Sequence, residues 1–87
     1  MATIFIPTSL RSLTNGTKQV TMWASNVRQA VELLDQMYPG VKSHLIEDGQ
    51  IRPDISVVID GESSPLGILD KVEKDSEIHF IPAIGGG

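Results

Sequence analysis

The chain has 87 residues, 40% of them hydrophobic, and a formal net charge of −4, so it holds one domain with one modest core. This acidic balance, without any run of Lys or Arg, disfavours nucleic acids and anionic membrane surfaces as partners and suits a partner protein with a basic face. The lack of cysteine excludes disulfides, thiolate catalysis and zinc–sulfur sites. Because no signal-peptide pattern or membrane-length apolar run is present, we expect a cytoplasmic protein.

Two strands are predicted at the start of the chain. Residues 2–7 alternate along the chain, which predicts a strand with Ile4 and Ile6 toward the core and Phe5 on the opposite face. An Asn-Gly pair then supplies a turn, and residues 17–23 return as a second strand. We expect the two strands to form a hairpin.

An amphipathic helix follows the hairpin. Ser25 or Asn26 is a suitable N-cap, and Pro39 with Gly40 ends the helix after about 13 residues, or roughly 20 Å. The apolar residues with the spacing of a core-facing stripe are Val27, Ala30, Val31, Leu34 and either Met37 or Tyr38. Trp23, just before this helix, is expected to be a partly buried packing residue rather than a contact residue.

The second half of the chain contains two further strands. Residues 54–60 and 77–82 have strand patterns, residues 41–53 are predicted as a connector, and residues 65–72 as a segment with a short helical turn. The residues of this half that we expect in the core, or tucked beneath the connector, are Leu45, Ile46, Ile55, Val57, Ile59, Leu69, Val72, Ile78 and Phe80.

The predicted order of elements is strand, strand, helix, strand, short elements, strand. One helix must bury its stripe on one sheet face, because two layers are the least that encloses a core. The predicted fold is therefore α+β, a β-grasp or ubiquitin-like roll, with a mixed sheet of about four to five strands on one main helix. In it the first and last strands lie side by side at the sheet centre. Residues 1–84 are expected to form this domain and residues 85–87 a flexible tail.

No group of residues meets the requirements of an active site. His44 and His79 lie far apart in the sequence, and neither forms a metal-binding pair with another ligand, so we expect surface roles for both. Ser63 and Ser64 lack the G-x-S-x-G context of a nucleophile. The chain is therefore expected to have neither catalytic residues nor metal ligands.

One apolar surface patch is predicted. If Ile4 and Ile6 face the helix, then Phe5, Val58 and Ile81 face the open side of the sheet, where their strands can be neighbours. Aromatic residues in such patches often mark protein interfaces, so we predict that Phe5, Val58 and Ile81 bind a partner. The alternative is that they only cover one another, because scattered exposed apolar residues are normal.

The chain closes on Gly85, Gly86 and Gly87, directly after the predicted last strand and its Pro82-Ala83-Ile84 extension. Three glycines have no Cβ atoms, adopt any φ and extend by at most about 10 Å. They are suited to deliver the Gly87 carboxylate into a pocket of another protein. A frayed terminus without function is the alternative.

These features resemble the ubiquitin-like sulfur carriers: the molybdopterin synthase small subunit, the thiamin sulfur carrier and the carrier that feeds a cysteine synthase. The resemblance covers essentially the whole chain and rests on "IPTSLRSLTNG", "RPDISVVIDGE" and "DSEIHFIPAIGGG". The final glycines are its most specific part, and "IPTSLR" is more similar to the cysteine-type carriers. Gly86 and Gly87 match the family's final Gly-Gly, whereas Gly85 replaces the more usual Ala or similar small residue.

The resemblance implies a mechanism and two partners. A ubiquitin-activating-type adenylyltransferase would adenylate the Gly87 carboxylate with ATP and magnesium, and a persulfide or sulfide would convert it to a thiocarboxylate. A sulfur-accepting synthase would then use the sulfur, either a cysteine synthase with pyridoxal phosphate or the molybdopterin synthase large subunit. All these cofactors would belong to the partners, and none to this chain. Two other functions stay open: a modifier joined through Gly87 to lysines of target proteins, and a binding module whose tail is incidental.

Overall fold

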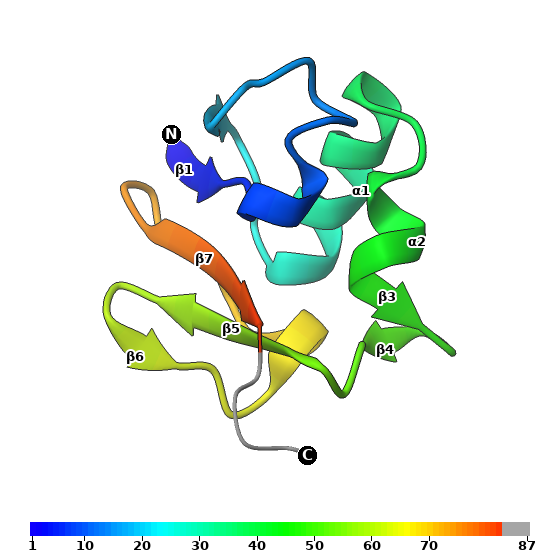
Figure 1. Ribbon diagram of the computed structural model, residues 1–87. Helices are drawn as coiled ribbons and strands as arrows, with labels where there is room; N and C mark the ends of the chain where they lie inside the picture. Colours follow the sequence, from blue (N-terminus) through cyan, green and yellow to red (C-terminus); the bar gives the residue numbers. More distant parts are fainter. Residues whose placement is uncertain (83–87) are drawn as a thin grey trace.

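The computed structural model describes residues 1–82, and a mixed five-stranded sheet with a helix on one face dominates them (Figure 1). The sheet has the order β2-β1-β7-β5-β6. Its elements are β1 (Ala2–Phe5), β2 (Gln19–Met22), β5 (Ile55–Ile59), β6 (Glu62–Ser63) and β7 (Glu77–Pro82), and the main helix is α1 (Val27–Met37). The shorter elements are η1 (Thr8–Leu10), α2 (Val41–Leu45), β3 (Ile46–Glu47), β4 (Gln50–Ile51) and η2 (Gly67–Leu69). The predicted α+β class and β-grasp fold are confirmed.

The first and last strands lie side by side at the centre of the sheet, as predicted. β1 runs parallel to β7, with Phe5 opposite His79, and antiparallel to β2. On its other side β7 runs antiparallel to β5, with Val58 opposite His79. A parallel pair requires a long crossover connection. The chain between β1 and β7 forms this connection, and it includes α1, which covers the sheet.

The core lies between the sheet and α1, and it contains most of the residues that the sequence patterns placed there. The buried residues of α1 are Val27, Ala30, Val31 and Leu34. Facing them from the sheet are Ala2, Ile4, Ile6, Met22, Val57, Ile78 and Phe80, all buried. Complete burial of an aliphatic side chain of this size contributes about 1.5–3 kcal/mol. The stripe of α1 is therefore a main source of the free energy that holds helix and sheet together.

Of the two candidates for the last position of the helix stripe, Tyr38 packs against the core and Met37 is exposed. Two other side chains predicted in or near the core are exposed instead. Leu69 is 70% exposed, whereas the preceding Ile68 is half-buried, because successive residues of a 3₁₀ turn face different directions. Trp23 is 66% exposed: it follows the buried Met22, so the alternation of the strand turns it away from the core.

The predicted connector at residues 41–53 contains regular structure. It forms α2 and the β3–β4 hairpin, and Leu45 is fully buried within it as expected. Asp35 of α1 caps the N-terminus of α2. Its Oδ1 accepts hydrogen bonds from the backbone N–H groups of Gly40 and Lys42, both at 3.1 Å. Among residues 1–82, no helix has the length and apolar character that would span a membrane.

Candidate functional site

The side chains that carry acid–base or metal chemistry are dispersed over the surface. Among residues 1–82, no three His, Asp or Glu side chains lie close enough to hold a metal ion. His44 lies on α2, where its Nδ1 is 2.8 Å from the Gly40 carbonyl oxygen, and His79 lies on β7.

Phe5, Val58 and Ile81 all lie on the outer face of the sheet, the face opposite α1. Phe5 and Val58 are the register partners of His79 on its two sides. Ile81 is two residues further along β7 and therefore faces the same way. Phe5 and Val58 are half-buried, and Ile81 is 42% exposed. The structure thus brings the three predicted residues together around a fourth, which the sequence reasoning placed only on the surface.

That fourth residue, His79, forms the centre of the patch. Its ring stacks on Phe5, with centroids 4.1 Å apart and 6° between the planes. Its Nε2 lies 3.8 Å from a carboxylate oxygen of Glu77 on the same strand. The alternation of β7 places His79 outward, but only the pairing with β1 and β5 shows that it lies between Phe5 and Val58. We call the four residues Phe5, Val58, His79 and Ile81 the sheet-face patch.

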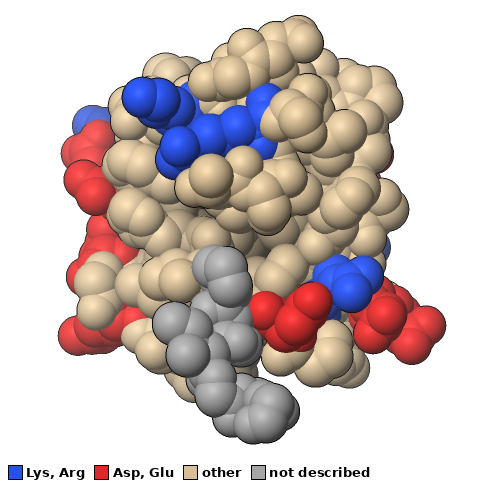
Figure 2. Space-filling model, in the orientation of Figure 1, with Lys and Arg blue, Asp and Glu red and all other residues tan. Residues whose placement is uncertain are grey.

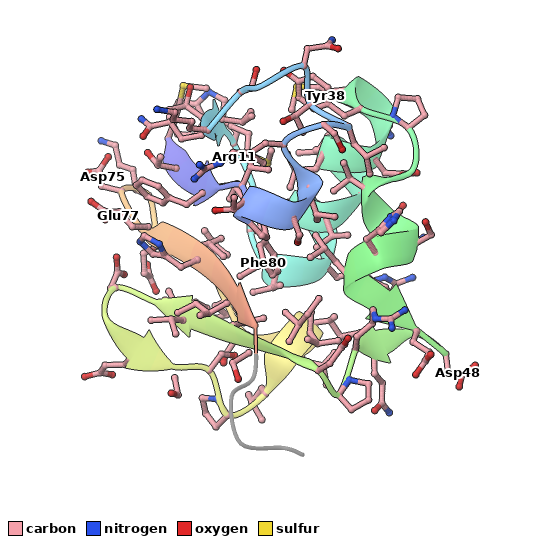
Figure 3. The ribbon with its side chains drawn as sticks, viewed as in Figure 1. Arg11, Tyr38, Asp48, Asp75, Glu77 and Phe80 are labelled. Carbon is pink, nitrogen blue, oxygen red and sulfur yellow. The ribbon has the colours of Figure 1, made fainter. Side chains whose placement is uncertain are left out.

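A shallow hollow of about 550 Å³ adjoins the sheet-face patch. Phe5, His79 and Ile81 line one side of it, and residues 7–9 line the other together with Arg11, which directly follows η1. The Arg11 Nε donates a 3.3 Å hydrogen bond to the Ile6 carbonyl oxygen, which holds the guanidinium beside the hollow (Figure 3). A partner side chain can enter this hollow and meet both an apolar surface and a cation.

A second hollow, of about 280 Å³, lies near the end of β7. Its lining includes the buried Leu10 and Phe80 and the ion pair of Arg52 and Asp54, whose Nε and Oδ1 are 3.1 Å apart. This hydrogen bond raises the pKa of Arg52 and lowers the pKa of Asp54. Both groups are exposed to solvent, so the pair contributes little to stability.

The tail begins at the centre of the sheet. β7 ends at Pro82, whose register partner is Ile55 of β5, and Ile55 lines the second hollow. Gly85, Gly86 and Gly87, for which we predict the transfer chemistry, lie outside the described residues. The described part therefore shows an apolar face and the point where the chain leaves it, on neighbouring positions of one strand.

Comparison with known proteins agrees with this architecture. The model of the ThiS family matches residues 4–87 of the chain. No curated protein sequence matches.

Among solved structures, a chain of the Amycolatopsis orientalis BexX/CysO complex is 27% identical, with a TM-score of 0.89 and complete coverage of both chains. Mycobacterium tuberculosis CysO is 21% identical, with a TM-score of 0.90, covering 97% of this chain and 100% of its own. The small archaeal modifier protein 1 of Methanosarcina acetivorans is 21% identical, with a TM-score of 0.80, covering 99% of this chain and 95% of its own.

The similarity to Mycobacterium tuberculosis CysO and to the modifier protein establishes the fold. The family match spans nearly the whole chain and includes the three final glycines. The chain therefore belongs to the ThiS family and is a ubiquitin-like sulfur carrier protein of the MoaD/ThiS type.

Proposed function

We propose that this chain carries sulfur as a thiocarboxylate on Gly87, and that a partner enzyme of the ubiquitin-activating type forms that group. The observation that carries the proposal is the match to the ThiS family over residues 4–87, which includes all three tail glycines. The proposal assigns every catalytic step, with ATP and Mg²⁺, to the partner.

The chemistry begins with an inert carboxylate. A carboxylate oxygen of Gly87 attacks the α-phosphorus of ATP, and pyrophosphate leaves. The product is an acyl-adenylate, in which AMP is a good leaving group. Sulfide then attacks the carbonyl carbon, AMP leaves and the thiocarboxylate remains. When the donor is a persulfide, the attack yields an acyl disulfide, and a thiol must reduce its S–S bond to release the thiocarboxylate.

The glycine tail suits these steps on steric grounds. Without Cβ atoms, Gly85, Gly86 and Gly87 can pass through a narrow channel and approach ATP closely. The five residues after Pro82 extend by at most about 18 Å, so the body of the carrier must dock near the partner's active site. We propose that the sheet-face patch forms this docking contact.

For the acceptor we propose a cysteine-forming synthase that uses pyridoxal phosphate. Two observations support it: "IPTSLR" resembles the cysteine-type carriers, and a chain of the BexX/CysO complex is 27% identical over the whole length of this chain. Molybdopterin synthase and direct conjugation to target lysines would use the same activated Gly87. ATP and reduced sulfur are both cytoplasmic, so we propose that the carrier works in the cytoplasm.

Deletion of Gly87 tests the proposal. The truncated chain is expected to keep the thermal stability of the full chain, since the core lies within residues 2–80, but to lose sulfur transfer in a reaction with activating enzyme, ATP and sulfide. Gln36→Ala, on the exposed side of α1, is the control. Undiminished sulfur delivery by the truncated chain would overturn the proposal.

A further inference from the structure

We propose that the docking face is electrostatically polarised: Arg11 on one side of the sheet-face patch and a carboxylate cluster on the other set the direction in which the activating enzyme sits. This inference rests on the proposed function and specifies the partner's chemistry. The enzyme must present a carboxylate opposite Arg11, an apolar surface opposite the sheet-face patch and basic side chains opposite the acidic cluster.

The sheet-face patch is too small to form the whole docking contact. A specific protein interface of standard size buries about 800 Å² on each partner, whereas one complete aromatic side chain supplies only about 150–250 Å². Phe5, Val58 and His79 are already half-buried by their neighbours. The contact must therefore extend over the residues around the patch, and their charges become part of it.

Arg11 is the cation at the η1 side of the patch. Within the described part of the chain, only its Nε is used, toward the Ile6 carbonyl oxygen at 3.3 Å. No Asp or Glu of residues 1–82 lies within ion-pair distance of its guanidinium. The guanidinium has five N–H donors in a fork that fits a carboxylate. It is thus suited to receive a carboxylate from a partner side chain in the adjoining hollow.

The opposite side of the patch is acidic. Glu77 faces outward on β7 two residues before His79, and its side chain is 60% exposed. The Oδ1 of Asp60 accepts a hydrogen bond from the Glu77 N–H at 2.9 Å, which joins the β5–β6 turn to the start of β7. We call Asp60, Glu73, Asp75 and Glu77, which lie in the β5–β6 turn, in the turn before β7 and at the start of β7, the acidic cluster.

The cluster keeps a net negative charge. Lys74 lies in the turn that carries Glu73 and Asp75, and the Met1 amino group is 3.6 Å from Asp75, so four carboxylates are opposed by two cations. Asp75 and Glu77 lie at the left edge of Figure 3, where Figure 2 shows acidic side chains gathered. Arg11 lies in the upper centre of Figure 3, where Figure 2 shows basic side chains.

Such polarity matters because the tail is short. A partner rotated by half a turn on the sheet-face patch would place like charges opposite each other, and like-charge contacts across an interface are strongly unfavourable. The same rotation would move its active site away from the end of β7, whereas the five residues after Pro82 span at most about 18 Å. Correct direction is therefore a requirement for adenylation, and the two charged regions provide it.

Charge reversal with matched controls tests the inference. The probe is the purified activating enzyme of the same organism, with ATP, and the measured quantities are KM and kcat for the carrier in pyrophosphate release. Arg11→Glu and Glu77→Lys are expected to raise KM by roughly tenfold or more at low salt, equivalent to about 1.4 kcal/mol, and to leave kcat unchanged. The defect shrinks in high salt, because salt screens exposed charges.

Two control variants carry the same charge changes on other surfaces. Arg28→Glu lies on the exposed side of α1 and Glu47→Lys on β3, and both are expected to keep the wild-type KM. Arg11→Gln, which removes the charge without reversing it, is expected to give a smaller increase in KM than Arg11→Glu. Equal thermal midpoints for all variants show that the fold is intact.

Three results would overturn the inference. If the wild type is adenylated and the Arg11 and Glu77 variants match their controls, polarised docking is wrong and the proposed function stands. If the wild type releases no pyrophosphate with an enzyme that is active on another carrier, the proposed function fails and the inference fails with it. If the wild type sediments as a dimer that Arg11→Glu dissociates, this face binds a second copy of the chain instead.

Discussion

Phe5 and His79 are register partners across the parallel pair of β1 and β7, and their rings stack with centroids 4.1 Å apart. The stack lies at the centre of the outer sheet face, with Val58 beside it and Ile81 further along β7. Rigid aromatic side chains lose little conformational entropy when a partner covers them. This pair is therefore well suited to anchor a docking surface.

Phe5→Ala and Ile81→Ala are each expected to weaken binding to the activating enzyme by roughly tenfold, because central aromatic and aliphatic contacts carry much of an interface's free energy. Both residues face away from the core, so the fold should persist. Titration calorimetry measures the affinity, and Gln36→Ala on the exposed side of α1 is the control. Unchanged affinity in variants of native stability would remove the patch from the docking site.

Leu34→Ala is expected to lower the free energy of unfolding by about 2–5 kcal/mol, the usual cost of a cavity at a buried leucine. Leu34 is fully buried between α1 and the sheet. Urea unfolding followed by circular dichroism measures the change, and Gln36→Ala should shift it by less than about 0.5 kcal/mol. A cost below about 1 kcal/mol for Leu34→Ala would contradict the assigned core.

Asn26→Ala is expected to destabilise the protein by about 0.5–2 kcal/mol through loss of a helix cap. The Asn26 Oδ1 accepts a hydrogen bond from the Gln29 N–H at 2.8 Å, and the Gln29 Oε1 accepts one from the Ser25 N–H at 2.6 Å. Asn26→Asp, which keeps an acceptor, should retain most of the stability. Thermal unfolding distinguishes the two variants, and equal losses in both would argue against the cap.

Trp23, the only tryptophan of the chain, is expected to fluoresce like an indole in water, because its side chain is 66% exposed. Acrylamide should quench it nearly as well in the folded protein as in urea. Emission that moves strongly to the red on unfolding would show that Trp23 is buried in solution.

The arrangement of strands and helix was predictable because each element has its own period. Ile4 and Ile6 alternate with Phe5 along β1, and Val27, Ala30, Val31 and Leu34 follow the helical spacing, so the two patterns define one face of each layer. With only one long helix available to cover the sheet, few arrangements bury the apolar face of the helix against the apolar face of the sheet.

Features that depend on contacts between distant segments were not predictable. The carboxylate that caps α2 comes from Asp35 on another helix, so no local signal marked residues 41–45 as helical. His79 becomes the centre of the sheet-face patch only because β1 and β5 flank β7 in a particular register. Leu69 was misassigned because the period of a three-residue 3₁₀ turn is too short to read from sequence.

The measurement that tests the central claim most directly is the intact mass of the protein after incubation with activating enzyme, ATP and a sulfide source. The account predicts replacement of one oxygen by one sulfur, located at Gly87 by fragmentation. An unchanged mass, with the enzyme shown to be active on a carrier of its own, would contradict the claim that this chain is its sulfur-carrying substrate.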